Sequence, residues 1–197
     1  MVPAASAASN LRELIALAKS QPQRVIYGSS GQGTSGHLAI ELLNFKTSIR
    51  MTHVPYKGAG QALIDLIGAQ IQLVCTSTLP ALPHVRSGQL RGLAVTSAAR
   101  SRAAPDVPTV AEAAALPGFR ASSWYALLAP ARTPPAIIGK LHGAAVQALR
   151  SPVMADQLLA QGAEAIAGTP DELSRFLQIE IDTWTTVIKA ANVKPNT

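Results

Sequence analysis

The residues best suited to chemistry form a run of glycines and hydroxyl side chains, GSSGQGTSG at residues 28–36. A short β-rich run precedes it at residues 25–27, and apolar residues at helical spacing follow it from His37. The sequence therefore predicts a strand, a glycine-rich loop and a helix. Backbone N–H groups at a helix start favour an anion, and four hydroxyls add short donors there: Ser29, Ser30, Thr34 and Ser35. We infer an anion-binding loop; the alternative is a plain helix cap that uses one or two of these hydroxyls.

Nucleotide and hydrolase chemistry fit this loop poorly. Residues 31–36 match the dinucleotide pattern G-x-G-x-x-G, but no acidic residue for the ribose lies about 20 positions on, around Met51. The phosphate loop of nucleotide hydrolases needs a lysine where this chain has Thr34, and the serine-hydrolase elbow needs a glycine at Gln32. The sequence favours a binding protein over an enzyme. The less favoured alternative is a nucleotide-dependent enzyme, or a serine hydrolase using Ser30 and His37.

Two further segments should lie at the same edge of the sheet, because the carboxyl ends of parallel strands meet there. One is HVPYKG at residues 53–58, in which Lys57 could attract an anion. The other is TST at residues 76–78, in which Thr76 could add a hydroxyl donor. His37, His53 and the other histidines are isolated in sequence, and no His, Cys, Asp or Glu group has metal-site spacing. We expect neither a metal nor a cofactor.

Strands and helices alternate through the first two thirds of the chain, which predicts an α/β fold with a parallel sheet. A capping box at Asn10 and Glu13 opens a first helix that ends at Ser20. Strands are expected at residues 25–27, 51–54, 71–75, 90–95 and 122–128, and helices at 61–67 and 110–115. Three amphipathic helices should follow: Pro135–Leu149, one beginning at Ser151-Pro152, and one led by the capping box Thr169–Glu172, with a shared apolar face of Leu173, Phe176, Leu177, Trp184 and Ile188.

Composition places the chain among globular proteins, with 48% hydrophobic and 14% charged residues. The net charge of +6 does not indicate nucleic-acid binding, because the basic residues are scattered and no aromatic residues lie between them. Cys75 lies in an apolar run and is expected to be a buried thiol. No segment has the roughly 20 apolar residues of a membrane span, and residues 1–9 lack the basic and apolar regions of a signal peptide.

Six motifs in order resemble the Bug solute receptors, the TctC-type substrate-binding proteins of tripartite tricarboxylate transporters. They are LRELIALAK (11–19), YGSSGQGTS (27–35) with HL (37–38), HVPYKG (53–58), LAVT (93–96), PDVPT (105–109) with AE (111–112), and LLAP (127–130). The resemblance implies a two-lobed Venus-flytrap fold like that of type II periplasmic binding proteins. It also implies a periplasmic receptor that binds a small carboxylate between its lobes and partners with membrane transporter subunits. The alternative is a cytoplasmic effector-sensing or orphan domain.

The same resemblance implies that four loop residues face the cleft: Ser30, Gly33, Thr34 and Ser35. Thr76 stands where many family members have an aspartate, and it is our fifth candidate ligand residue. The strand and glycine-rich loop that begin the family's chain have no counterpart here, so we expect a complete second lobe and only part of the first. We expect residues 9–120 to form the α/β lobe. Residues 121–197 would then form a crossover strand and helices that pack on the missing first lobe, and their exposed apolar surface predicts self-association or domain exchange.

Overall fold

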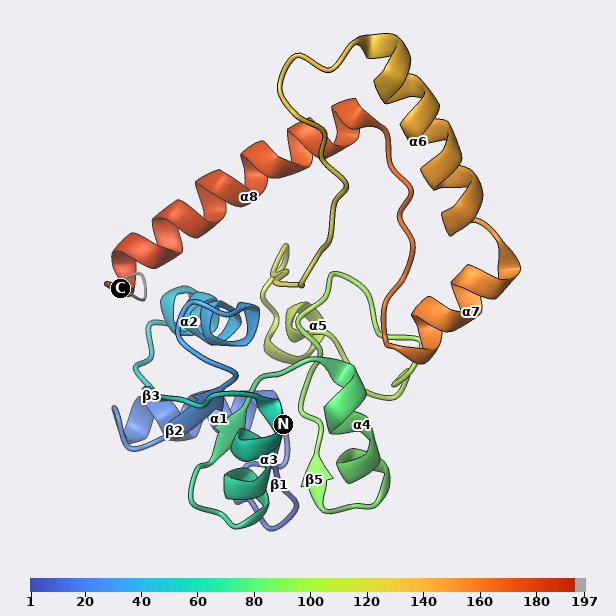
Figure 1. Cartoon of the computed structure of the whole chain (residues 1–197). Coiled ribbons are helices and arrows are strands. Elements are labelled where there is room, and N and C mark those ends of the chain that lie inside the picture. Colours follow the sequence, from blue (N-terminus) through green and yellow to red (C-terminus); the bar gives the residue numbers. More distant parts are fainter. Residues whose placement is uncertain (194–197) are drawn as a thin grey trace. The chain divides into compact units, whose positions relative to one another are not determined.

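A computed structural model describes residues 1–193, and Figure 1 labels their elements. In chain order these are β1 (Val2–Pro3), α1 (Leu11–Ser20), β2 (Ile26–Ser29), α2 (Ser35–Thr47), β3 (Thr52–Pro55), α3 (Ala59–Ile67), β4 (Leu73–Val74), α4 (Thr78–Arg86), β5 (Leu90–Arg91), α5 (Val110–Ala114), α6 (Pro135–Leu149), α7 (Pro152–Ala160) and α8 (Pro170–Ala190). Two compact units result within the described residues: residues 1–122 together with residues 185–193, and residues 123–184.

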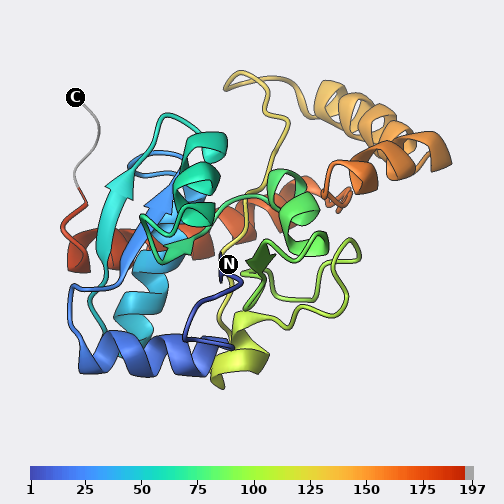
Figure 2. The ribbon, with the colours of Figure 1, turned by 90° about the horizontal axis from the view of Figure 1, so that it is seen from below.

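The first unit is built on a three-stranded parallel sheet in the order β3-β2-β4, as the alternating pattern predicts. Tyr27 of the central strand lies opposite His53 on one side and Leu73 on the other. The connection from β2 to β3 runs in one direction across the sheet, and the connection from β3 to β4 runs back past β2. Because such crossovers are right-handed, α2 and α3 cover opposite faces of the sheet, as Figure 2 shows.

A second, two-stranded sheet corrects the expected strand at residues 90–95. Only Leu90–Arg91 is a strand, and it pairs antiparallel with β1, which the sequence analysis did not predict. Further on, Val95 makes a single parallel bridge to Thr109. Met1 joins the two sheets, because its carbonyl accepts the Val74 N–H and its amino group donates to the Val74 carbonyl, both at 3.0 Å. A two-residue strand containing a proline has no period that sequence can reveal, so β1 depends on these partners.

The core of this unit is aliphatic. Residues of α3 pack on the strands beside them in one buried cluster of Ala62, Leu63, Leu66, Ile71, Val74 and Leu90. α1 is held by the predicted cap, since the Asn10 side chain accepts the Glu13 N–H at 3.0 Å. Its buried positions Leu11, Leu14 and Ala18 follow the helical spacing seen in the sequence.

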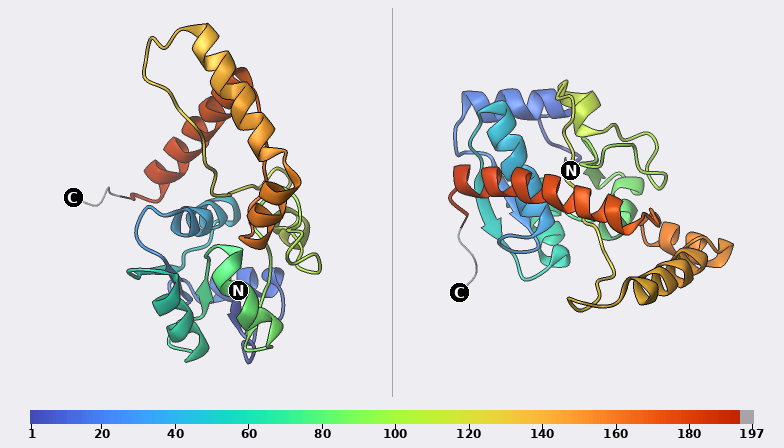
Figure 3. Two further views of the ribbon diagram at one scale, coloured as in Figure 1. Left: turned by 45° about the vertical axis from the view of Figure 1, so that its right-hand side comes forward. Right: turned by 90° about the horizontal axis from the view of Figure 1, so that it is seen from above.

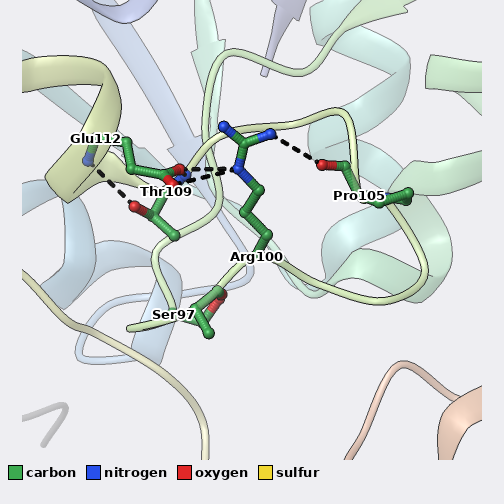
Figure 4. Close-up of polar contacts among 6 residues, drawn as sticks. Ser97, Arg100, Pro105, Thr109 and Glu112 are labelled. Atoms are coloured by element: carbon green, nitrogen blue, oxygen red, sulfur yellow. Dashed lines mark hydrogen bonds and ion pairs between the residues drawn. The ribbon is translucent and has the colours of Figure 1, made fainter.

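The motif at residues 105–112 has a structural explanation in α5. Thr109 and Glu112 form a reciprocal capping box: the Thr109 hydroxyl accepts the Glu112 N–H at 3.1 Å and a Glu112 carboxylate oxygen accepts the Thr109 N–H at 2.8 Å. Arg100 donates to the same carboxylate at 3.0 Å and to the Pro105 carbonyl at 3.2 Å (Figure 4). One carboxylate therefore ties the proline-punctuated segment to the start of α5.

The second unit contains the helices expected in the last third of the chain. α6 has the predicted bounds, α7 starts after Ser151, whose hydroxyl accepts the Met154 N–H, and Thr169 caps α8. α6 and α7 contact each other near the turn that joins them (Figure 3). Neither helix has a buried residue, and large apolar side chains are exposed along the unit, among them Tyr125, Leu127, Ile137, Leu141, Val153 and Ile166.

The strand expected at residues 122–128 is wrong: these residues have no regular secondary structure. A strand needs a neighbour for its N–H and C=O groups, and no described strand pairs with this segment. Side chains attach it to α8 instead. The Trp124 ring meets Phe176 edge to face with centroids 5.4 Å apart, and its Nε1 donates to Glu180 at 3.2 Å.

The apolar face of α8 is close to the predicted one. Leu173, Phe176, Leu177 and Trp184 are half-buried, but Ile188 is exposed and the buried residue of the last turns is Val187. The predicted apolar face of α8 is thus displaced by one residue at its carboxyl end, from Ile188 to Val187. None of the helices described in residues 1–193 has the length and hydropathy needed to cross a lipid bilayer.

The capping box of α5 gives a stability prediction. Thr109→Ala should lower the free energy of unfolding further than Thr109→Ser, because serine keeps the hydroxyl that accepts the Glu112 N–H. We expect the two variants to differ by about 1 kcal/mol, the usual contribution of a cap. Urea unfolding followed by circular dichroism measures the difference. Equal losses in both variants would mean that only the buried methyl group of Thr109 matters.

Candidate ligand-binding site

The glycine-rich loop leaves β2 at Ser29 and enters α2 at Ser35. Gly31 and Gly33 have φ values of 138° and 74°, which side-chain-bearing residues rarely adopt. Thr34 is the N-cap residue of α2, but its side chain does not cap the helix. Its hydroxyl donates instead to the Gly31 carbonyl at 2.7 Å. The loop is therefore closed by its own hydrogen bonds.

Ser29 adds a second internal tie. Its hydroxyl donates to the Gly31 carbonyl at 2.9 Å and accepts the Gly31 N–H at 3.3 Å, and it lies 2.8 Å from His53 Nε2. Because the single hydroxyl proton goes to Gly31, His53 must donate from Nε2. Ser29 is fully buried, so it supports the loop from below and is not a donor to a ligand.

The ends of the other two parallel strands lie beside this loop. The Tyr56 N–H, after β3, donates to the Ser29 carbonyl at 3.0 Å, and the Cys75 N–H, after β4, reaches the Gly28 carbonyl at 3.4 Å. Gly36 in the first turn of α2 is so close to the Cys75 carbonyl that a Cβ would overlap the oxygen. Thr76 follows directly, so it lies next to the start of α2, as expected from the parallel sheet.

The five candidate ligand residues thus belong to one edge of the sheet. Ser30, Gly33, Thr34 and Ser35 lie within residues 30–35 of the loop, and Thr76 is adjacent through Cys75 and Gly36. Ser30, Thr34 and Thr76 are half-buried, whereas Gly33 and Ser35 are exposed. The Thr34 hydroxyl donates to the Gly31 carbonyl, and the Gly33 N–H donates to His37 Nδ1 at 2.9 Å.

Lys57 and Tyr56 differ in their relation to this edge. The Tyr56 ring packs over Gly28, and its hydroxyl donates to Asp65 of α3 at 2.7 Å. Burial and this contact raise the pKa of Tyr56 to about 12. The tyrosine is therefore turned toward α3, while Lys57 is exposed next to it and adds positive charge near the loop.

Three rings beneath the loop were missed as a group by sequence reasoning. The His37 and His53 rings stack with centroids 3.8 Å apart and planes 10° from parallel, and Tyr27 stacks on His53 at 4.9 Å. Burial and the adjacent His37 lower the pKa of His53 to about 4, and burial lowers the pKa of His37. The sequence did offer one signal for part of this arrangement: His37 follows Gly33 by four residues at a helix start, which lets its ring reach the Gly33 N–H.

The geometry does not assemble a catalytic site in this lobe. The Ser30–His37 pair of the hydrolase alternative is not formed, because His37 Nδ1 accepts the Gly33 N–H and its ring stacks on His53. Ser29, which does contact a histidine, is buried. Burial also raises the pKa of the Cys75 thiol, which makes it a poor nucleophile. Within residues 1–193 no three His, Cys, Asp or Glu side chains gather as metal ligands.

An open hollow of about 480 Å³ lies at the opposite end of α2 from the glycine-rich loop. Three of the side chains around it are cationic: Arg12, Lys19 and Lys46. The other lining residues are Ile15, Thr47, Ser48, Ala114 and Leu116, so none of the five candidate residues lines it. It meets the carboxyl end of α2, where the helix dipole opposes an anion. The donor-rich loop at the amino end of α2, where the dipole favours an anion, is the better anion site.

A parallel α/β unit with a donor-rich loop at the carboxyl edge of its sheet is suited to binding a small anion. The family model described as "Tripartite tricarboxylate transporter family receptor" (TctC) matches residues 1–193. The chain belongs to this family of receptors, which are not enzymes.

Among its relatives, protein BugT of Bordetella pertussis is 37% identical over 185 residues, which cover 94% of this chain and 56% of BugT. A UPF0065 protein from the clcB-clcD intergenic region of Pseudomonas knackmussii is also 37% identical, over 155 residues that cover 79% of this chain and 92% of that protein. This chain therefore spans little more than half of BugT and nearly all of the second relative.

Solved structures show the same fold. "R. palustris Rpa4515 with adipate" superposes with a TM-score of 0.81 at 33% identity, over 99% of this chain and 65% of that one. MatC from Rhodopseudomonas palustris with bound malate gives a TM-score of 0.74 at 29% identity, over 95% and 64%. The chain thus has about two thirds of a periplasmic-binding-protein fold, which confirms the expected fold class.

The contact between Gly36 and Cys75 gives a second prediction. Gly36→Ala should destabilise the chain by roughly 1–3 kcal/mol, because the new Cβ forces α2 away from the Cys75 carbonyl. Gly60→Ala is the matched control, because Gly60 lies in α3 and a Cβ added there would meet open space. The free energy of unfolding of this variant should change by less than about 1 kcal/mol. Guanidinium unfolding compares the two. A tolerated Gly36→Ala would contradict the close approach of α2 to β4.

Proposed function

We propose that this chain is the carboxylate-binding lobe of an extracytoplasmic solute receptor. The observation that carries the proposal is the glycine-rich loop at the amino end of α2, where hydroxyls and helix N–H groups gather beside the ends of β3 and β4. The candidate ligand residues are Ser30, Gly33, Thr34, Ser35 and Thr76. Binding, with no bond chemistry, is the whole of the mechanism at this site.

The residues divide by role. The hydroxyls of Ser30 and Thr76 would bind the carboxylate oxygens, together with N–H groups of the first turn of α2, which begins at Ser35. Gly33 and Thr34 shape the loop, since the N–H of one and the hydroxyl of the other are bonded within it. Exposed Lys57 would attract the anion without a fixed hydrogen bond.

The ligand class follows from the donors and from the relatives. Short hydroxyls and amides without a fixed cation suit a small carboxylate better than a phosphate monoester, which arginine usually binds. Structural neighbours were solved with adipate and with malate. We infer a dicarboxylate, a tricarboxylate or an acidic amino acid derivative as the ligand, and the periplasm as the compartment.

The second unit would serve the complete receptor. Apolar side chains on residues 123–184 are exposed, with Tyr125 at 95% and Leu127 at 84% of their full accessibility. Structural neighbours have about a third of their length beyond the region matched here. We infer that these side chains pack on the first lobe of the receptor fold. Closure of two lobes on the ligand would then present a surface to the membrane subunits of a tripartite transporter.

Titration calorimetry with adipate, malate and citrate tests the carboxylate site. Ser30→Ala and Thr76→Ala should each weaken binding of the preferred compound roughly tenfold, the loss typical of one hydrogen bond to a charged group. Ser20→Ala is the control, because its hydroxyl bonds only within α1, at the end of the unit remote from the loop. Affinity unchanged in both loop variants, or lowered equally in the control, would show that the site lies elsewhere.

A further inference from the structure

The loop depends on a side chain that is not among its proposed ligand donors. His37 is buried in the first turns of α2, with its ring stacked on His53 and 6.2 Å from Tyr27. This packing fixes the plane of the imidazole. Its Nδ1 then faces the glycine-rich loop and accepts the Gly33 N–H at 2.9 Å.

That hydrogen bond sets the protonation state of the ring. An imidazole nitrogen can accept only when it carries no proton, so His37 must be the neutral Nε2–H tautomer. Protonation would place a second N–H at Nδ1, directed at the Gly33 N–H. Two donors cannot share that position, and Gly33, at a φ of 74°, would lose its contact with α2.

We propose that His37 is a positioning residue, which holds the glycine-rich loop in its binding shape through Nδ1 and does so only while the ring is neutral. The effect on the loop is independent of any ligand. Its effect on affinity rests on the proposed carboxylate-binding function.

The groups around the ring determine the sign of the pH effect. Burial lowers the pKa of His37, and Glu41, one turn further along α2, opposes this by attraction. The other facing groups are Tyr27 of β2, whose hydroxyl bonds Glu41, and His53 of β3. A proton on Nδ1 removes the lone pair that accepts the Gly33 N–H. The bond is therefore complete above pH 6.5, the ordinary pKa, and is lost as the pH falls through the lowered value.

His53 stays neutral through most of that range, since its pKa is about 4. Its Nε2 donates to Ser29, a bond that protonation leaves in place. The acid response at Gly33 is therefore assigned to His37 rather than to its stacked neighbour.

Nuclear magnetic resonance of the ligand-free chain tests the loop directly. The Gly33 amide resonance should shift with pH in the wild type, with a midpoint below 6.5 that matches the His37 ring. In His37→Asn it should stay constant, because the asparagine oxygen occupies the Nδ1 position and does not titrate. A Gly33 resonance that ignores titration of the His37 ring would overturn the proposal.

Calorimetry with adipate at pH 7.5 then separates positioning from packing. His37→Asn keeps an acceptor for Gly33 and should bind within about threefold of the wild type, whereas His37→Gln, whose oxygen lies at the Nε2 position, should bind roughly tenfold more weakly. Equal losses in both variants would show that the ring acts only through packing. If no variant or wild type binds adipate, malate or citrate, the proposed function fails, while the Gly33 resonance still decides the role of His37.

Discussion

Parallel hydrogen bonding of β2 to strands on both sides is the constraint on which the candidate site depends. The register that sets Tyr27 against His53 and Leu73 brings the ends of β3 and β4 beside Ser29. Only a glycine then fits at position 36, in the first turn of α2, against the Cys75 carbonyl. The loop between β2 and α2 has little freedom left, and its glycines at positive φ complete the turn. Sheet register, helix approach and loop shape are thus one coupled arrangement.

Elements that are stabilised by interactions between residues close in sequence could be predicted from the sequence. The predicted caps at Asn10, Ser151 and Thr169 start helices by bonds to residues three positions on, and the strand-loop-helix pattern around residues 25–42 is equally local. The β1–β5 pair could not be predicted, since two residues carry no period and their partners lie nearly ninety positions away. Residues 122–128 have a strand-like composition, but no described strand completes them.

The candidate site divides in the same way. Four of its five residues lie within residues 30–35. The hydroxyl donors at a helix start pointed to Ser30, Thr34 and Ser35, and the family resemblance added Gly33. Thr76 followed from the rule that parallel strands end at one edge. The ring stack of Tyr27, His37 and His53 needs the register between β2 and β3 together with the rotation of α2. The spacing between two residues in the sequence does not determine how α2 is rotated about its axis relative to the sheet. The histidines therefore looked isolated until the helix was placed on the sheet.

The internal bonds of the loop have an energetic consequence for any molecule that binds there. Ser29 and Thr34 both hold the Gly31 carbonyl, and His37 holds the Gly33 N–H, so the backbone is ordered when the protein folds. Conformational entropy is then lost during folding and not at the moment of capture. A loop that is already ordered in this way loses little further conformational entropy when a ligand binds. The fit of each solute to a fixed loop geometry would accordingly set its affinity. Small changes in the spacing between carboxylate groups would then change the affinity, because the loop does not adjust to them.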